Sequence, residues 1–192
     1  MTLPDLGRHA LEVAPLLLGA RLVSDVGGVR TEVRLREVEA YGGPEDPASH
    51  AANGPTKRCQ TMFDRPGTLY VYLSYGVHWL ANVVTGREGE GQAVLLRGGL
   101  PVEGVAMMEA RRRRGDHLAD GPGKLGRAMG IGPEHDGLDL LDPSSEIRLE
   151  PGTPPTDHRV TTRIGLTRAV DYPWRFLASP AEIRAGMAGV RG

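Results

Sequence analysis

Five runs of strand-forming residues, most of them separated by glycine turns, constrain the fold of this chain more than any other feature of its sequence. The runs are residues 21–26, 29–41, 67–75, 77–84 and 92–97. Gly27-Gly28 separates the first two runs and Gly76 separates the next two, so each pair predicts two strands joined by a tight turn. We therefore expect an α+β fold with a curved, mostly antiparallel sheet and a protruding β-hairpin.

Helices are expected to flank this sheet. Apolar residues recur at helical spacing in residues 9–19, residues 103–114 begin acidic and end basic, and a short helix is predicted after the Gly-Pro-Gly opening of residues 121–130. Residues 42–66 hold four prolines and three glycines, which predicts a long loop of the kind that often carries functional residues. The length fits one domain, which we assign to residues 1–192.

Charge and cysteine content exclude several classes of protein. A net charge of −1 and a pI near 6.6 argue against a domain that binds polyanions over its whole surface. Positive charge is almost all arginine, which suits bidentate contacts to phosphate and is equally typical of a GC-rich genome. Cys59 stands alone and the histidines lack metal-ligand spacing, so no disulfide, metal or cofactor is expected. Without a run of about 18 apolar residues or a cleavable leader, we expect a cytoplasmic protein with no membrane attachment.

Four of the five tyrosines fall between positions 41 and 75, although only 5% of the residues are aromatic. Side chains alternate along a strand, so Tyr70 and Tyr72 are predicted to share one face and Tyr75 to lie on the other. Gly76 follows Tyr75 and favours a turn, which predicts an aromatic ring near the tip of a hairpin. Such a ring is a candidate for insertion into a partner, whereas Tyr70 is expected to pack.

Two carboxylates lie near the end of the second strand. By alternation Glu37 and Glu39 share a face with Val33 and Leu35, so the face would begin apolar and end acidic. A carboxylate that loses hydration has a raised pKa, which prepares it for proton transfer. The alternative is a structural ion pair, for which Arg97 at the end of another strand is the candidate partner.

Other polar residues also allow two interpretations. His50 could join Tyr41 and Tyr72 around a planar ligand, or it could be an ordinary hydrogen-bonding histidine. Asn82 interrupts an apolar strand, and it serves either core hydrogen bonding or recognition. The basic run from Arg111 to Arg114 is either a solvated helix face or a phosphate contact. The segment before Lys124 lacks the spacing of a phosphate loop, although helix amides there could still meet a phosphate.

Many of these residues recur in one known pattern. In order and spacing the chain resembles the alkyladenine (3-methyladenine) DNA glycosylase family. The resemblance is carried by Glu39-Ala40-Tyr41, Gly43-Pro44-Glu45-Asp46, His50, Met62-Phe63, Pro66-Gly67, Tyr70-Val71-Tyr72, Tyr75-Gly76, Asn82 and Leu95-Leu96-Arg97. It extends more weakly from Leu11 to Gly165 and so covers most of the chain.

The resemblance implies a monofunctional enzyme that hydrolyses the N-glycosidic bond of damaged purines flipped out of duplex DNA, for base excision repair. Glu39 would activate water with help from Arg97. The implied base pocket consists of Tyr41, Ala48, His50, Tyr72, Asn82 and Ile164. Tyr75, with Val77 beside it, would fill the gap left in the duplex. The implied substrates are 3-methyladenine, 7-methylguanine, hypoxanthine and ethenoadenine.

Further expectations concern the partner. We expect a monomer that binds double-stranded DNA near the nucleoid, with candidate phosphate contacts at Arg58, Arg111, Arg112 and Lys124. Neither lysine matches a catalytic position, which disfavours lyase activity. Cys59, Ser74 and Val77 depart from residues common in the family.

Two other functions remain open on the sequence. The same rings could serve a nucleic-acid binding module without hydrolysis, which would bind DNA without forming abasic sites. A carbohydrate hydrolase with Glu37 and Glu39 as its acid pair is disfavoured. Their Cα atoms would lie about 7 Å apart, but two residues on one strand face do not flank a sugar.

Overall fold

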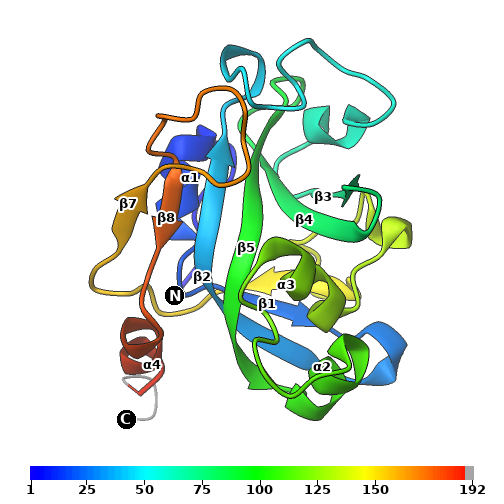
Figure 1. Cartoon of the computed structure of the whole chain (residues 1–192), viewed down its shortest axis with the longest axis vertical. Coiled ribbons are helices and arrows are strands. Elements are labelled where there is room, and N and C mark those ends of the chain that lie inside the picture. Colours follow the sequence, from blue (N-terminus) through cyan, green and yellow to red (C-terminus); the bar gives the residue numbers. More distant parts are fainter. Residues whose placement is uncertain (189–192) are drawn as a thin grey trace.

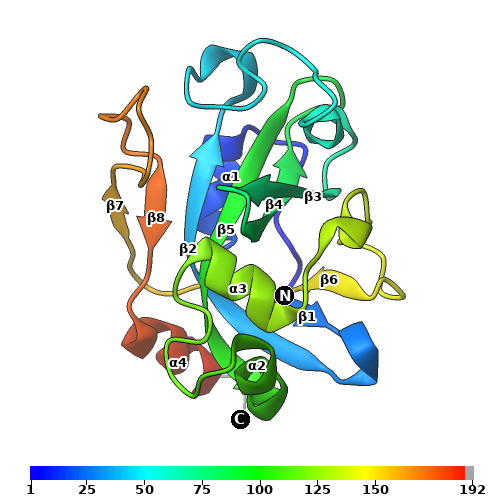
Figure 2. The same ribbon diagram turned by 45° about the vertical axis from the view of Figure 1, so that its right-hand side comes forward.

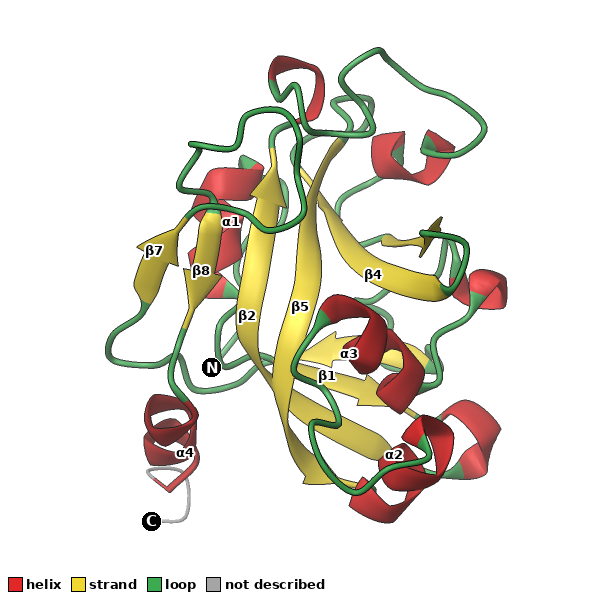
Figure 3. Cartoon of the chain, viewed as in Figure 1, coloured by secondary structure: helices red, strands yellow, loops and turns green. Residues whose placement is uncertain are grey.

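One curved sheet of eight strands organises residues 1–188, the part of the chain that the computed structural model describes (Figures 1 and 3). Its main path runs β3-β4-β5-β2-β1-β6, and β8 pairs with both β2 and β7. The strands are β1 (Arg21–Ser24), β2 (Thr31–Tyr41), β3 (Leu69–Ser74), β4 (His78–Thr85), β5 (Gln92–Glu103), β6 (Ile147–Glu150), β7 (Arg159–Thr161) and β8 (Arg175–Leu177). Every strand pair in the described residues is antiparallel. The predicted α+β fold is confirmed, and residues 189–192 of the expected domain lie outside the described residues.

Helices lie on both sides of the long central strands. They are α1 (Ala10–Leu16), α2 (Val105–Arg112), α3 (Pro122–Met129) and α4 (Pro180–Ala188). Figure 2 shows α3 in front of β5 and α1 behind it. Buried residues of α1 and α3 join those of the strands in one hydrophobic core. The three predicted helical segments each contain a helix, slightly shorter than expected, and α4 is an element that the sequence pattern did not indicate.

In the middle of β2 the alternation of core-facing and outward-facing residues is inverted. Val33 and Leu35 point into the main core, but so do Val38 and Ala40, which have the opposite parity. The register of β2 against β5 shifts on both sides of Glu37, as at a β-bulge. The expectation that one face begins apolar and ends acidic is therefore wrong. Glu39 lies on the face opposite to the main core, because the bulge inverts the alternation.

Strand β5 is twice as long as the run that predicted it. Gly98, Gly99 and Pro101 resemble strand breakers in the sequence, yet β5 continues to Glu103 and pairs with β2 along most of its length. A Cβ on Gly99 would lie 2.6 Å from Cγ2 of Val33, so this glycine permits close approach of the two strands. The helix predicted from residue 103 consequently begins at Val105.

Helix α3 packs directly on the backbone of the hairpin strand β4. A Cβ on Gly126 would lie 2.4 Å from the carbonyl oxygen of Trp79, and one on Gly123 would lie 2.7 Å from Cγ of His78. At Gly126 the contact is with backbone, so only glycine allows this approach, whereas at Gly123 the His78 side chain would have to move. The helix therefore supports β4 next to the turn that joins it to β3.

The predicted long loop between β2 and β3 is confirmed. It contains only short 3-10 turns at Gly43–Glu45 and Gln60–Phe63. A second, smaller hydrophobic cluster fixes the loop against the sheet, and it consists of Ala51, Cys59, Met62, Tyr70, Val84 and Ala93. The loop is thus anchored on the face of the sheet opposite to the main core.

Candidate active site

Alternate residues of four adjacent strands build one polar and aromatic face, opposite to the main core. Tyr70 and Tyr72 come from β3, Leu80 and Asn82 from β4, Leu95 and Arg97 from β5, and Glu39 and Tyr41 from β2. Their neighbours in sequence, such as Val71, Ala81, Leu96 and Ala40, point into the core. A strand alternation of period two thus separates the site from the core.

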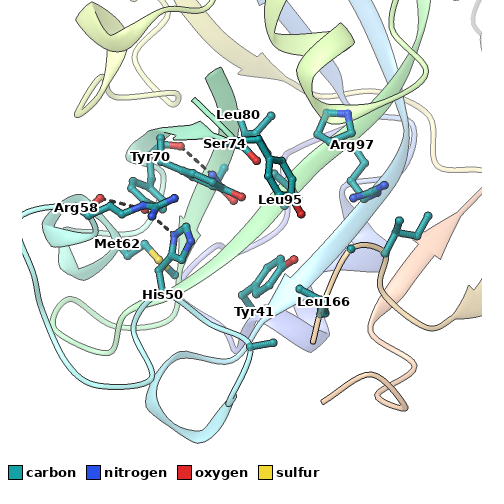
Figure 4. A pocket seen from close by; sticks show the side chains of 17 residues that line it. Tyr41, His50, Arg58, Met62, Tyr70, Ser74, Leu80, Leu95, Arg97 and Leu166 are labelled. Carbon is teal, nitrogen blue, oxygen red and sulfur yellow. Dashed lines mark hydrogen bonds between the residues drawn. The ribbon is translucent and has the colours of Figure 1, made fainter. Parts of the chain in front are cut away.

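A cavity of about 550 Å³ opens on this face (Figure 4). Loop residues complete its wall, including Ala48 and His50 from the loop after β2 and Ile164 from the loop before β8. All predicted base-pocket residues line the cavity, as do Arg97, Tyr75 and Arg58. The volume is within the usual range for a site that encloses a small ligand.

Glu39 lies one layer behind the cavity wall, with no exposed surface. Its Oε1 accepts the backbone N–H of Ile164 at 2.8 Å and lies 3.3 Å from Nη1 of Arg97. Its Oε2 accepts the hydroxyl of Tyr41 at 3.0 Å. Since all three partners line the cavity, the carboxylate is held directly beneath its floor.

The pKa values of Glu37 and Glu39 in β2 are shifted in opposite directions. Burial raises the pKa of Glu39, and the opposing effects of Arg97, the Ile164 N–H and Tyr41 do not cancel it. Burial also acts on Glu37, but hydrogen bonds from Arg97 at 2.8 Å and Arg175 at 2.9 Å keep its pKa below the usual value. Glu37 is therefore the ion-pair partner that the sequence left open, and Glu39 has the environment of a proton acceptor.

His50 and two tyrosines form one wall of the cavity. The rings of Tyr70 and Tyr72 stack at 5.5 Å, and the ring of His50 meets that of Tyr72 edge-on at 4.5 Å. The Tyr70 hydroxyl donates to the carbonyl of Arg58 at 3.1 Å and lies 3.0 Å from Nδ1 of His50. Because that hydroxyl proton is already used, Nδ1 of His50 is the donor and Nε2 keeps a lone pair. Burial and the charge of Arg58 lower the pKa of His50, which favours the neutral imidazole.

Tyr41 lies in the other wall and is covered on one side by a cation. The guanidinium carbon of Arg163 lies 4.7 Å from the centre of the Tyr41 ring. Arg163 does not line the cavity, so it covers the side of the ring turned away from it. Burial raises the pKa of Tyr41, and it raises that of Tyr72 to about 12, so both rings are neutral phenols.

Asn82 hydrogen-bonds within the sheet and also borders the cavity, while its role in recognition stays a prediction. Its Nδ2 donates to the carbonyl of Tyr70 at 3.1 Å, and the side chain also lines the cavity. A carbonyl can only accept, so this bond fixes which end of the amide is nitrogen. The Asn82 side chain is thus a rigid part of the cavity wall.

The turn between β3 and β4 presents Tyr75 at the mouth of the cavity. Tyr75 and Gly76 both have positive φ, 48° and 70°, and the N–H of Val77 donates to the carbonyl of Ser74 at 3.1 Å. These are the features of a type I′ hairpin turn, which rarely holds a bulky residue at its first central position. Tyr75 is 86% exposed and Val77 is 68% exposed. Strand alternation does not extend into the turn, so Tyr75 borders the same cavity as Tyr72 and not the opposite face.

The candidate phosphate contacts are dispersed. Arg58 borders the cavity, with its guanidinium carbon 5.7 Å from the centre of the Tyr72 ring. Lys124 is paired with Asp120 at 2.9 Å beside the start of α3. Arg111 donates to the carbonyls of Ala128 and Val26, a structural role that neither interpretation of the basic run included. The phosphate roles of these residues, and of Arg112, stay predictions.

Two features of the site escaped sequence reasoning. The ion pair of Arg163 with Asp46 is completely buried and joins two loops, and the hydroxyl of Tyr70 orients His50 as well as packing. An arginine and an aspartate separated by more than a hundred residues carry no local signal of pairing. Only the general rule that a buried guanidinium is paired with an acidic group could have indicated this contact.

Within residues 1–188, no group of three or more acidic, histidine or cysteine side chains could hold a metal ion. No helix there is long and apolar enough to cross a membrane. The arrangement offers instead a buried carboxylate beneath a slot walled by neutral rings.

Comparison with known proteins identifies relatives of this chain. Residues 5–181 match the family model described as methylpurine-DNA glycosylase. A Cutibacterium acnes protein with the provisional name 3-methyladenine DNA glycosylase is 46% identical, over 90% of this chain and 92% of its own length. Proteins of the same provisional name from Rhodopseudomonas palustris and Chlorobaculum tepidum are 49% and 40% identical, over 88% and 96% of this chain and 82% and 92% of their own lengths.

Proposed function

Because the chain belongs to the methylpurine-DNA glycosylase family and is a DNA glycosylase of base excision repair, we propose that it removes damaged purines by direct hydrolysis at Glu39. The observation that best supports this proposal is that a carboxylate of raised pKa lies directly beneath an aromatic slot. The N-glycosidic bond is out of reach inside a duplex, so the nucleotide must leave the base stack. The slot is of a size and composition that would receive the extruded base.

The contacts of Glu39 suggest where the attacking water binds. The Ile164 N–H and Arg97 occupy Oε1, so the free lone pair of the carboxylate is on Oε2, beside the Tyr41 hydroxyl. We propose that the water joins or replaces this hydroxyl when the base enters. Glu39 then takes the proton of the water and its charge stabilises the cation-like sugar of the transition state.

The walls suit a range of damaged purines. Tyr41 on one side and Tyr72 with His50 on the other would stack against the base, and such rings favour bases that carry positive charge. Asn82 is fixed at the edge of the slot, where it would crowd the amino group of guanine. We propose 3-methyladenine and 7-methylguanine as substrates, with hypoxanthine and ethenoadenine as further candidates.

Tyr75 is the proposed wedge. An exposed ring held by a strained turn at the mouth of the slot could fill the space that the extruded nucleotide leaves. Val77 lies beside it on the same turn. We propose that the partner is duplex DNA, that the protein acts as a monomer, and that it works in the cytoplasm beside the nucleoid.

Direct hydrolysis also predicts the absence of lyase activity. No lysine is among the residues that line the cavity within the described chain, so no amine is placed to attack the sugar carbon. Excision should therefore yield an intact abasic site. The strand should break only after treatment with alkali.

The test is the substitution Glu39→Gln, which keeps the shape of the side chain and removes its basicity. Single-turnover excision of 7-methylguanine from a duplex should fall by at least about a thousandfold, since general-base and electrostatic effects both disappear. Glu32→Gln is the matched control, because Glu32 is a buried, ion-paired acid at the other end of β2.

Three results are informative. Loss of excision in Glu39→Gln alone supports the proposal. Wild-type excision by Glu39→Gln would refute the role of Glu39. A wild-type protein that retards damaged duplexes yet produces no alkali-sensitive sites would instead be a binding module.

A further inference from the structure

Within residues 1–188 the ion pair between Arg163 and Asp46 is the most deeply buried salt bridge, and it lies beside the site. Nη2 of Arg163 contacts Oδ1 of Asp46 at 2.8 Å, a second contact joins the other two atoms, and neither side chain has exposed surface. The guanidinium carbon lies 4.7 Å from the ring centre of Tyr41 and 4.9 Å from that of Trp174. A charged pair is thus enclosed by rings and by backbone.

This pair connects three segments that meet at the cavity. Arg163 also donates to the carbonyl of Ala40 at 3.0 Å, at the end of β2. Asp46 accepts the N–H of Ala48 at 3.0 Å and so shapes the loop that carries a cavity residue. The residue after Arg163 is Ile164, whose N–H donates to Glu39. Each loop that closes the cavity on this side therefore holds one partner of the pair.

Stability alone does not account for the pair. Burying two charges carries a desolvation penalty that their attraction often fails to exceed, and apolar residues of similar volume would often be as stable. Nε of Arg163 is also buried without a hydrogen-bond partner. Apolar replacements would instead lose the directed contacts by which the pair holds the two loops at the cavity.

We propose that Arg163 and Asp46 form a positioning pair for the reaction, holding Tyr41 from behind and fixing the Ile164 amide on Glu39. The inference rests on the proposed role of Glu39. Neither residue of the pair lines the cavity, so neither is expected to touch the base. Their substitution should therefore impair the chemical step and leave DNA affinity almost unchanged.

The pair also acts on Glu39 through charge. The charged and titratable groups around this carboxylate are Arg97 from β5, Glu37 and Tyr41 from β2, Tyr72 from β3, and Arg163. Arg163 lowers the pKa of Glu39, and Asp46 partly offsets its charge. Removing one partner leaves the other unbalanced, so the two substitutions should move the pKa of Glu39 in opposite directions.

The experiment measures the rate of single-turnover excision of 7-methylguanine between about pH 5 and 9. The acid limb of this pH–rate profile, where the rate falls as pH falls, reports the protonation of Glu39. Asp46→Asn leaves the Arg163 charge unopposed, so the acid limb should move to lower pH. Arg163→Gln leaves the Asp46 charge unopposed, so the limb should move to higher pH. Arg163→Lys restores the charge without the two-point contact, and its limb should return toward the wild-type position.

Rates at the optimum should fall about 10- to 100-fold in all three variants, because small misplacements of catalytic groups have effects of this size. The dissociation constant for a duplex with an abasic-site analogue should change by less than about threefold, since no DNA contact is lost. Glu32→Gln serves as the control, because it disturbs a buried ion-pair network far from the site. Its limb and rate should match the wild type.

Unshifted limbs in Asp46→Asn and Arg163→Gln, or shifts in the same direction, would overturn the inference. If Arg163→Gln does not fold, the direction of the limb in Asp46→Asn decides alone. Full excision by Glu39→Gln would instead remove the proposed function itself. Loss of excision in Glu39→Gln with wild-type behaviour of the pair variants would refute only the positioning role.

Discussion

The strained turn at Tyr75 predicts opposite effects of one substitution on stability and on function. Tyr75 has a φ of 48° at the first central position of the hairpin turn, where a non-glycine residue costs roughly 1–2 kcal/mol. Asparagine tolerates this conformation better, and Asn-Gly is the preferred pair for a type I′ turn. Because the Tyr75 side chain is 86% exposed, Tyr75→Asn loses little packing. We expect the free energy of unfolding to rise by about 0.5–1 kcal/mol.

The gain should be visible in thermal denaturation. In a protein of this size, 1 kcal/mol corresponds to roughly 2–4 °C in Tm, so Tm should rise by about 1–4 °C. The rate of excision, in contrast, should fall. Stacking of an aromatic ring on a base contributes about 1–3 kcal/mol, so the extruded state should become about 5- to 150-fold less populated.

The assay combines three measurements on Tyr75→Asn and the wild type. They are Tm, single-turnover excision, and the fluorescence of a base analogue placed next to the lesion, which reports unstacking. Ala169→Asn is the matched control, because Ala169 also has a positive φ, 47°, and is absent from the cavity wall. It should gain similar stability and keep full excision. A Tm below the wild type would refute the strain argument, and unchanged excision with unchanged fluorescence would refute the wedge.

Four further predictions follow from the site and its support. Burial raises the pKa of Glu39 in the folded state, so the contribution of this residue to stability is complete below its unfolded pKa and is lost as pH rises through its folded pKa. In urea unfolding, the free energy of unfolding of Glu39→Gln should therefore increase relative to that of the wild type from about pH 4 to pH 8. Gly126→Ala should lower the free energy of unfolding by about 1–3 kcal/mol and also slow excision, because the methyl group would meet the Trp79 carbonyl; a loss below about 0.5 kcal/mol would contradict this. Tyr70→Phe should cost about 1–2 kcal/mol and reduce excision severalfold, since it frees His50; unaltered kinetics would show that the orientation of the ring is unimportant. Excision should persist in EDTA, and its loss on chelation with recovery on added metal would contradict direct hydrolysis by Glu39.

Local pattern was sufficient for the hairpin and for the shared face of its two strand tyrosines. Residues i and i+2 of a strand share a face, so spacing alone predicted that Tyr70 and Tyr72 lie on the same side of β3. Gly76 specified the turn that exposes Tyr75. The resemblance to a known family then selected His50, Asn82 and other wall residues that the cavity indeed brings together.

Pairing between distant segments decided the rest. The bulge at Glu37 depends on how β2 fits against β5, and no alternation within β2 alone reveals it. It determines that Glu39 faces the cavity side and that Glu37 takes the ion pairs with Arg97 and Arg175. Local sequence could nominate both acids, but it could not assign their roles.

By itself, then, the sequence determined an α+β fold with a mostly antiparallel sheet and a ring near the tip of a hairpin, because these depend on spacing within single elements. The resemblance to a known family added the residue types of the aromatic slot. The tertiary structure alone decided which carboxylate is buried without a full counter-charge, how the tautomer of His50 is fixed, and how Arg163 and Asp46 join two loops across 117 residues of chain. Burial and ion pairing depend on every segment that packs around a group, and such neighbours have no fixed separation in the sequence.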